Sequence, residues 1–298
     1  RRLSCMRMTE GGGAAPEASS EPLGQPVDEP PKRRRSRLGL LIPVLVVSVL
    51  ALVAVTKELP YYAIGPGPVR PVDGLIQVPP DRAFPSKGQF LLMSVSLRDV
   101  TPFEAARGWL DPDVDVIKAQ KVIGAPPTPQ TKRVFEEKLG RDMVFSRNVA
   151  VDVALQRLRI PVPEPGQPPQ PGVPPFEVKI NTGETGGASG GLALTLGVLD
   201  TLTDGDLTGG HRVAVSGSIF ITGHVGDIDG IAQKTAAARS AGARYMLVAP
   251  LNYDEALAHA GGKLKVLKVA HIDEAITALR EIGGELGPQR EPVPEPEP

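Results

Sequence analysis

A glycine-rich turn followed by an almost wholly apolar run constrains this chain most. The turn reads Gly186-Gly-Ala-Ser189-Gly-Gly191, and the apolar run continues from Leu192 to Leu199. Because glycine lets the backbone adopt positive φ and approach its neighbours closely, such a turn can be tight. A run with no polar face predicts a helix that is buried on most sides. The sequence therefore places Ser189 at the N-terminus of a buried helix.

This position makes Ser189 a candidate nucleophile. The unpaired N–H groups and the dipole at a helix N-terminus stabilise developing negative charge. Backbone groups of the turn, at Gly187, Ala188 and Gly190, would then form an oxyanion site beside the hydroxyl. Two other interpretations remain, a plain tight turn capped by a serine and a phosphate-binding loop. The second is disfavoured because the chain contains no G-x-x-x-x-G-K-[ST] motif.

A serine nucleophile needs a base, and Lys234 is the best candidate. It is the one lysine of the alanine-rich stretch 230–242, where burial, also against the helix from Leu192, would lower its pKa and leave an amine able to accept a proton. An exposed lysine on an amphipathic helix is the alternative. No H-E-x-x-H motif and no cysteine pair is present, so we expect no metal and no other cofactor. Surface or packing roles are expected for the four histidines, His211, His224, His259 and His271.

The N-terminal part predicts a tail and a membrane anchor. Residues 1–37 are rich in Gly, Ala, Pro, Glu and Ser and end in a basic cluster, so we interpret them as a disordered cytoplasmic segment. Residues 38–56 are interpreted as a transmembrane helix, because Leu38 to Val55 carry no charge and would span about 27 Å. The positive charges precede this helix, which places the chain after Lys57 on the extracytoplasmic side of the cell membrane. A cleaved signal peptide is the alternative.

The chain after the anchor changes character three times. We expect an extracytoplasmic N-terminal region (57–159), a Pro-rich linker or loop (160–176), a compact domain (177–285) and a disordered tail (286–298). Within the first of these, Ile64 to Pro68 predicts a rigid turn and 89–96 a strand. Thr101-Pro102 with Glu104 predicts a helix start, and helical spacing appears at 148–158. The compact domain has thirteen acidic and nine basic residues, so a nucleic-acid partner is not expected.

Several motifs in order resemble the proteolytic domain of Lon-type serine proteases. They are Gly187-Ala-Ser189-Gly-Gly, Asp204-Gly-Asp-Leu-Thr-Gly-Gly210, Val215-Ser-Gly-Ser, Gly226-Asp-Ile-Asp-Gly-Ile-Ala-Gln-Lys234 and Ala237-Ala-Arg-Ser-Ala-Gly-Ala243. The resemblance covers about residues 176–285 and implies an α+β fold of the Lon C-terminal-domain type. It also implies a catalytic dyad of Ser189 and Lys234, supported by Ser216, whose hydroxyl hydrogen-bonds the lysine.

The N-terminal part is similar to the membrane-anchored branch of this family, with an anchor and a Tyr-Tyr-x-x-x-Pro-Gly-Pro sequence at 61–68. That branch usually carries a PDZ domain before the catalytic serine, and the stretch 160–176 is too short for one. The family's usual Gly-Pro-Ser-Ala-Gly turn reads Gly-Ala-Ser-Gly-Gly here, so Ala188 lacks the fixed φ of proline. The acidic residue that often lies three positions before the serine is replaced by Gly186.

The sequence thus predicts a membrane-anchored serine endopeptidase that works without ATP, since no Walker motif is present. Its expected partner is a flexible or unfolded extracytoplasmic polypeptide. The resemblance also suggests a six-membered ring, so a homo-oligomer is a further expectation. A non-catalytic, membrane-tethered scaffold or peptide-binding protein with the same fold is the alternative, motivated by the altered serine turn.

Overall fold

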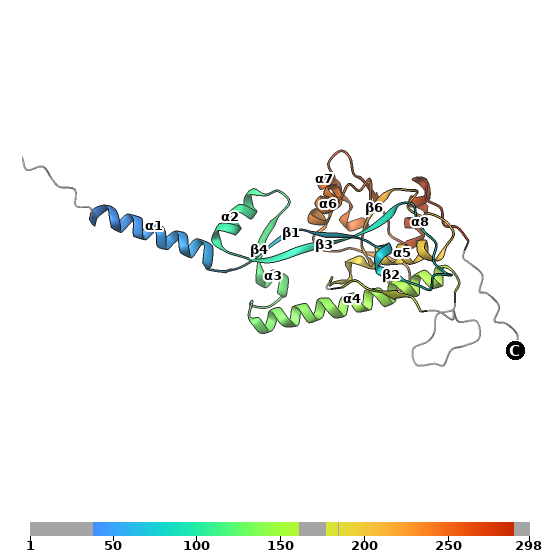
Figure 1. Cartoon of the computed structure of the whole chain (residues 1–298), viewed down its shortest axis with the longest axis horizontal. Coiled ribbons are helices and arrows are strands. Elements are labelled where there is room, and N and C mark those ends of the chain that lie inside the picture. The colour runs from blue at the N-terminus through green and yellow to red at the C-terminus, as the bar shows by residue number, and fades with distance from the viewer. Residues whose placement is uncertain (1–37, 161–176, 184, 289–298) are drawn as a thin grey trace, which may run out of the picture. The chain divides into compact units, whose positions relative to one another are not determined.

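The structure is a computed structural model that describes residues 38–160, 177–183 and 185–288 (Figure 1). The predictions made for residues 1–37, for most of the Pro-rich stretch and for the tail from 289 lie outside these ranges. The chain divides into two units after Ser48, within helix α1 (Leu38–Thr56), so α1 is described by itself. Its large apolar side chains from Leu41 to Val55 are exposed. Among the helices of the described ranges, none is long and apolar enough to cross a membrane.

Six strands form the central sheet, in the order β10-β9-β6-β3-β1-β4. One half is antiparallel and consists of β1 (Leu59–Pro71), β3 (Gln89–Val100) and β4 (Asp115–Lys118). The other half is parallel and adds β6 (Arg212–Ser216), β9 (Tyr245–Val248) and β10 (Lys265–Lys268) to β3. Strands from 57–159 and from 177–285 therefore share one sheet, and the two ranges fold together. The mixture of helices and sheet agrees with the expected α+β class.

Two hydrophobic cores lie on opposite faces of this sheet. Strand residues alternate between the faces, so Val213 and Val215 join one core while Ala214 joins the other. The first core is closed by α4 (Pro129–Arg157), α5 (Gly191–Leu202) and α8 (Ile272–Glu281), and the second by α6 (Ile231–Ser240) and α7 (Tyr253–His259) (Figure 1). Helix α5 is buried over almost its whole length, which confirms the prediction made from its apolar run.

Shorter elements complete the described part of the chain. The remaining helices are α2 (Pro102–Leu110), α3 (Ala119–Ile123), η1 (Asp73–Leu75), η2 (Ala188–Gly190) and η3 (Pro250–Asn252). Two small ladders pair β2 (Ile76–Gln77) with β5 (Lys179–Ile180), and β7 (Ser218–Ile219) with β8 (Val225–Gly226).

The stretch from Ile64 to Pro68 differs from the expected rigid turn, because it lies within β1. Strand β1 pairs with β4 only as far as Ile64, so its later residues have a neighbour, β3, on one side alone. Proline is tolerated in a strand where no ladder hydrogen bond is required of its nitrogen. A register shift between Pro66 and Val69 accommodates the two prolines.

Helix α4 is much longer than the helical spacing at 148–158 predicted. It begins at Pro129 with Thr128 as its N-cap, the same Thr-Pro signal that starts α2 at Thr101. Its buried residues are confined to the C-terminal half, from Met143 onward, which packs on α5. The N-terminal half has few buried positions, so no apolar period marks it in the sequence.

Candidate active site

Ser189 lies in the 3-10 turn η2, immediately before α5, as the glycine-rich sequence predicts. Gly187 precedes the turn with φ of 87°, a value that favours glycine. The first N–H groups of a 3-10 turn have no partner inside the turn, and here they belong to Ala188 and Ser189. The Ser189 residue is half-buried, so a substrate can reach it. The turn thus offers a hydroxyl beside unpaired backbone donors.

Helix α4 holds this turn in place from outside it. The Ser146 hydroxyl donates to the carbonyl oxygen of Ala188 at 3.1 Å, and the Gly187 N–H donates to the carbonyl oxygen of Leu139 at 2.8 Å. Neither Ser146 nor Leu139 was a candidate from the sequence. The Thr128-Pro129 start of α4 was the signal that could have placed this helix beside the turn.

A second attachment ties the serine turn to the sheet. The Gly217 N–H donates to the carbonyl oxygen of Ser189 at 3.0 Å, and the Leu192 N–H donates to the carbonyl oxygen of Gly217 at 3.1 Å. Gly217 directly follows Ser216, the last residue of β6. The backbone of the candidate nucleophile is therefore held one residue beyond the end of β6.

Gly190 has a steric reason to be glycine in this chain. A Cβ atom built there would lie 2.6 Å from Cδ1 of Leu92, and Leu92 is buried in the first core. Glycine at position 190 therefore leaves room for the leucine packed beneath it. Nearby, a Cβ on Gly191 would come within 2.9 Å of both Ile219 and Ser146, so the start of α5 also approaches its neighbours closely.

Ser216 and Lys234 share the second core, on the opposite face of the sheet from α5. Ser216 alternates with Val215 on β6 and so points to the same face as Ala214, the face that α6 covers. Only 1% of Ser216 is exposed, and its hydroxyl has no hydrogen-bond partner among the residues of the described ranges. The helix from Leu192 packs in the first core, and its expected contact with Lys234 stays a prediction.

Lys234 is buried within α6, with only 4% of its surface exposed. Its Nζ atom reaches back along its own helix and donates to the carbonyl oxygen of Asp229 at 3.1 Å. Burial lowers the pKa of the Lys234 amine to about 8, and the negative charge of Asp229 opposes this effect. A substantial fraction of the amine is therefore neutral at mildly alkaline pH, as a general base requires.

Ser189 precedes a helix of the first core, and Lys234 lies in a helix of the second. Within the described ranges, no hydrogen bond joins Lys234 to Ser189 or to Ser216. Catalytic hydrogen bonds are often long in structures without substrate, so this geometry leaves the dyad a prediction.

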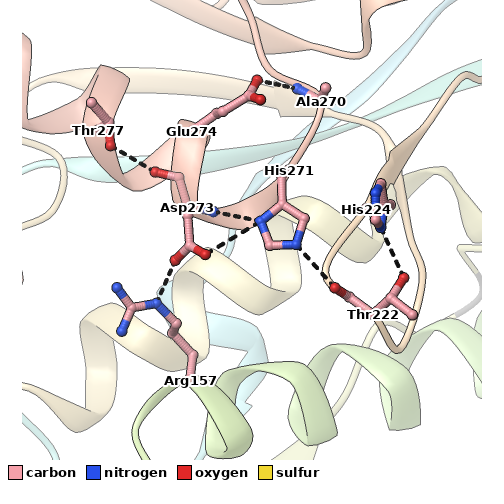
Figure 2. Close-up of polar contacts among 8 residues, drawn as sticks. All are labelled: Arg157, Thr222, His224, Ala270, His271, Asp273, Glu274 and Thr277. Carbon is pink, nitrogen blue, oxygen red and sulfur yellow. Dashed lines mark hydrogen bonds and ion pairs between the residues drawn. The ribbon is translucent and has the colours of Figure 1, made fainter.

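The histidines have structural contacts instead. In Figure 2, His271 caps α8 by accepting from the Asp273 N–H at 3.3 Å, and its Nε2 bonds the carbonyl oxygen of Thr222 at 2.9 Å. A carbonyl can only accept, so the ring is in the tautomer with its proton on Nε2. His224 Nδ1 bonds the hydroxyl of the same threonine at 3.0 Å. Together they fasten the turn between β7 and β8 to the start of α8.

The same network extends to the end of α4. Arg157 Nε lies 2.6 Å from an oxygen of Asp273, whose other oxygen is 3.4 Å from His271 Nδ1 (Figure 2). The other two histidines have separate contacts, since His211 packs against the ring of Tyr245 and His259 bonds the carbonyl oxygen of Glu255. In the part of the chain that the structure describes, no three His, Cys, Asp or Glu residues group as a metal site would need.

Comparisons with known proteins give one finding about family. Residues 178–281 match the family model of the Lon protease (S16) C-terminal proteolytic domain. The match contains Ser189, Ser216 and Lys234, and it begins and ends close to the limits expected from the sequence motifs. A serine protease is what this family implies. No curated protein matches the chain.

Proposed function

We propose, from the premise that residues 178–281 form a Lon protease (S16) C-terminal proteolytic domain, that this protein is a serine endopeptidase with a dyad of Ser189 and Lys234. The observation that carries the proposal is the burial of Lys234, which lowers the pKa of its amine to about 8. An exposed lysine would be almost fully charged at neutral pH and unable to accept a proton. The alternative of an exposed surface lysine is thereby removed.

The neutral amine has the right number of donors and acceptors for the role. It carries two N–H donors and one lone pair, and one donor already binds the carbonyl oxygen of Asp229. We assign the second donor to the hydroxyl of Ser216, which is buried on the same face and has no partner among the described residues. The lone pair is then free to accept the proton of Ser189.

The reaction follows from these assignments. Ser189 Oγ attacks the carbonyl carbon of the scissile peptide bond while its proton passes to Lys234 Nζ. The tetrahedral intermediate collapses, the C–N bond breaks, and the ammonium of Lys234 protonates the leaving amine. Water then attacks the ester on Ser189 and passes a proton to Lys234. The bond between the acyl carbon and Ser189 Oγ breaks, Lys234 returns the proton to Oγ, and the acid product is released.

The oxyanion of the intermediate needs preorganised donors, which the N-terminal end of η2 supplies. The N–H groups of Ala188 and Ser189 are unpaired within the turn, and they are followed by the N-terminus of α5. The Gly187 N–H is not available for this role, because it is used by Leu139. We therefore assign the oxyanion site to Ala188 and Ser189 rather than to Gly187.

The substrate and the energy source are further parts of the proposal. No Walker motif occurs in the sequence, so we propose that hydrolysis needs no ATP and acts on flexible or unfolded polypeptides. The half-buried position of Ser189 supports a substrate that binds as an extended chain. Cleavage of an unfolded protein at equal rates with and without ATP, while the folded form resists, is the expected result.

Membrane attachment with an extracytoplasmic catalytic domain also remains a proposal. It is supported by the uncharged sequence from Leu38 to Val55, the basic residues at 32–37 and the exposed apolar side chains of α1. Protease added outside intact cells should remove the domain after Lys57. Protection of the domain from that protease would contradict the orientation.

A non-catalytic scaffold is the second candidate, favoured by the absence of a hydrogen bond between Ser189 and Lys234 in the described ranges. A fluorophosphonate probe separates the two, because it reacts only with an activated serine. We expect labelling of the parent chain, none of Ser189→Ala, and none of Lys234→Arg, whose guanidinium does not release its proton. Equal labelling of the parent and Ser189→Ala would favour the scaffold.

A further inference from the structure

Helix α2 exposes large apolar side chains instead of burying them. The helix spans Pro102–Leu110, and a capping box formed by Thr101 and Glu104 defines its start. Of its side chains, Phe103 is 54% exposed, Trp109 is 69% exposed and Leu110 is 86% exposed. A helix of a soluble domain normally turns such residues inward. The exposed face of α2 therefore requires an explanation of its own.

The buried face of α2 is made of the smallest residues. Ala105 packs with Ala63 and Val100 in a small third cluster of the sheet's antiparallel end. Gly108 approaches β4 so closely that a Cβ atom would lie 2.6 Å from Val116 Cγ2. At about 100° per residue, Phe103 and Leu110 project from the side of the helix opposite these two. Phe103 and Leu110 are thus turned away from the sheet, while Trp109 projects from the flank of the helix, about 40° around the axis from Ala105.

Two arginines lie beside this apolar face. Arg98 and Arg107 are both exposed, and both lie near Glu104. The carboxylate of Glu104 turns back to the helix start, where it accepts hydrogen bonds from the backbone and hydroxyl of Thr101. These hydrogen bonds keep the pKa of Glu104 below its usual value.

The acidic residues that flank α2 bond groups of the domain. Asp99 pairs with Lys132 of α4 at 2.6 Å, and Asp113 pairs with Arg239 of α6 at 3.1 Å. Asp111 accepts a hydrogen bond from the Asp113 N–H. Asp99 and Asp113 are thus neutralised by cations of other helices, while Glu104 and Asp111 balance the charges of Arg98 and Arg107.

The position of α2 in the chain points to one kind of partner. The chain enters the domain at Leu59, and this residue pairs with Val100, two positions before α2 begins. Only two residues separate Leu59 from the end of α1 at Thr56. The apolar face thus lies at the end of the sheet where the strongly apolar N-terminal segment joins the domain.

We propose that α2 docks on a lipid bilayer, with Phe103, Trp109 and Leu110 at the boundary between headgroups and acyl chains and with Arg98 and Arg107 among the headgroups. Aromatic and aliphatic residues beside arginines are the composition that binds this boundary. A second copy of the chain is a weaker explanation, because one nine-residue helix offers far less than the roughly 1,200 Å² that a stable interface buries. Docking would hold the domain against the membrane independently of its peptidase chemistry.

Trp109 is the chain's only tryptophan and reports directly on this docking. The full chain is reconstituted into phosphatidylcholine vesicles containing some phosphatidylglycerol, with bromine atoms placed on shallow acyl carbons in a parallel set. We expect the emission of Trp109 to lie to the blue of that of a tryptophan fully exposed to water. We also expect the brominated lipid to quench it. Both effects should be lost in the double variant Phe103→Ser with Leu110→Ser, which leaves Trp109 in place.

The control is Leu251→Ser, which removes a leucine that is 81% exposed in η3, and it should leave the quenching unchanged. All three substituted side chains are exposed, so each variant should have the same unfolding midpoint as the parent. Peptidase activity on a soluble peptide in detergent should also be the same in the parent and the double variant, which separates docking from the proposed catalysis.

Each other outcome overturns the proposal. If the protein binds vesicles but its tryptophan is not quenched, the N-terminal segment binds the membrane and α2 does not dock. If the blue shift increases with protein concentration and the brominated lipid does not quench the emission, a second copy of the chain covers α2. Failure of the chain to sediment with vesicles would remove both the anchor and the docking.

Discussion

Replacing Lys234 by methionine should make the protein more stable at neutral pH while removing its activity. The amine is buried, with 4% of the residue exposed, and burial lowers its pKa from 10.5 to about 8. At about 1.4 kcal/mol for each pKa unit, the folded state loses about 3 kcal/mol by holding the ammonium. Methionine fills a similar volume without a charge. The carbonyl of Asp229 loses a hydrogen bond, which reduces the gain by about 1 kcal/mol.

The dependence of this gain on pH is the sharper test. Below pH 8 the amine is protonated in the folded and unfolded chains alike, so the parent carries the whole penalty. Between pH 8 and 10.5 the folded chain releases the proton while the unfolded chain keeps it, so the stability of the parent rises with pH. Above about pH 10.5 the penalty is gone. The advantage of Lys234→Met should therefore shrink as pH rises through this window.

Urea unfolding measured at several pH values from about 7 to about 10.5 gives the difference directly. Lys263→Met is the matched control, because Lys263 is exposed, and its difference from the parent should not change with pH. A Lys234→Met advantage that stays constant over the window would refute the reasoning, because it would arise from packing alone. So would a variant that is less stable than the parent at pH 7.

Three further results are expected. Asp229→Asn removes the negative charge that raises the Lys234 pKa, so the rise of activity with pH as Lys234 deprotonates should move to lower pH; an unmoved rise would contradict Lys234 as the base. Ser216→Ala removes the hydroxyl assigned to bind Lys234, so activity should be reduced, whereas Ser216→Thr keeps a hydroxyl and should stay active in the same peptidase assay. Burial raises the pKa of Asp200 to about 6, so Asp200→Asn should stabilise the fold at pH 7 by up to about 3 kcal/mol and make no difference below pH 4, as denaturant titrations at both values would show.

The serine turn and α5 could be predicted because their signals are local. Glycines on both sides of Ser189 and an unbroken apolar run define a turn and a buried helix within fourteen residues of sequence, 186–199. Helix α4 was underestimated for the opposite reason, since only its second half packs in the core. The prolines of β1 suggested a turn because the sequence does not show that the strand has a single neighbour beyond Ile64.

The relation between the candidate residues depends on contacts far apart in the chain. Strand β3 pairs with β6, and Gln89 faces Arg212, a residue 123 positions later in the chain. This pairing decides on which face of the sheet each side chain lies. It places Ser216 in the core covered by α6, on the side away from α5. No local pattern near Lys234 or Leu192 contains that register, so the sequence could suggest a lysine base but not the face on which it is buried.

Because the proposed base and nucleophile belong to different cores, their properties can change separately. Substitutions that loosen the packing of α6 hydrate Lys234 and raise its pKa, while the hydrogen bonds of Gly217 and Ser146 still fix the serine turn. Relatives could therefore adapt to a more acidic or more alkaline surrounding by repacking one layer, without rebuilding the other. If the α6 layer opens first on heating, the proposed activity should be lost while the helices around α5 stay folded.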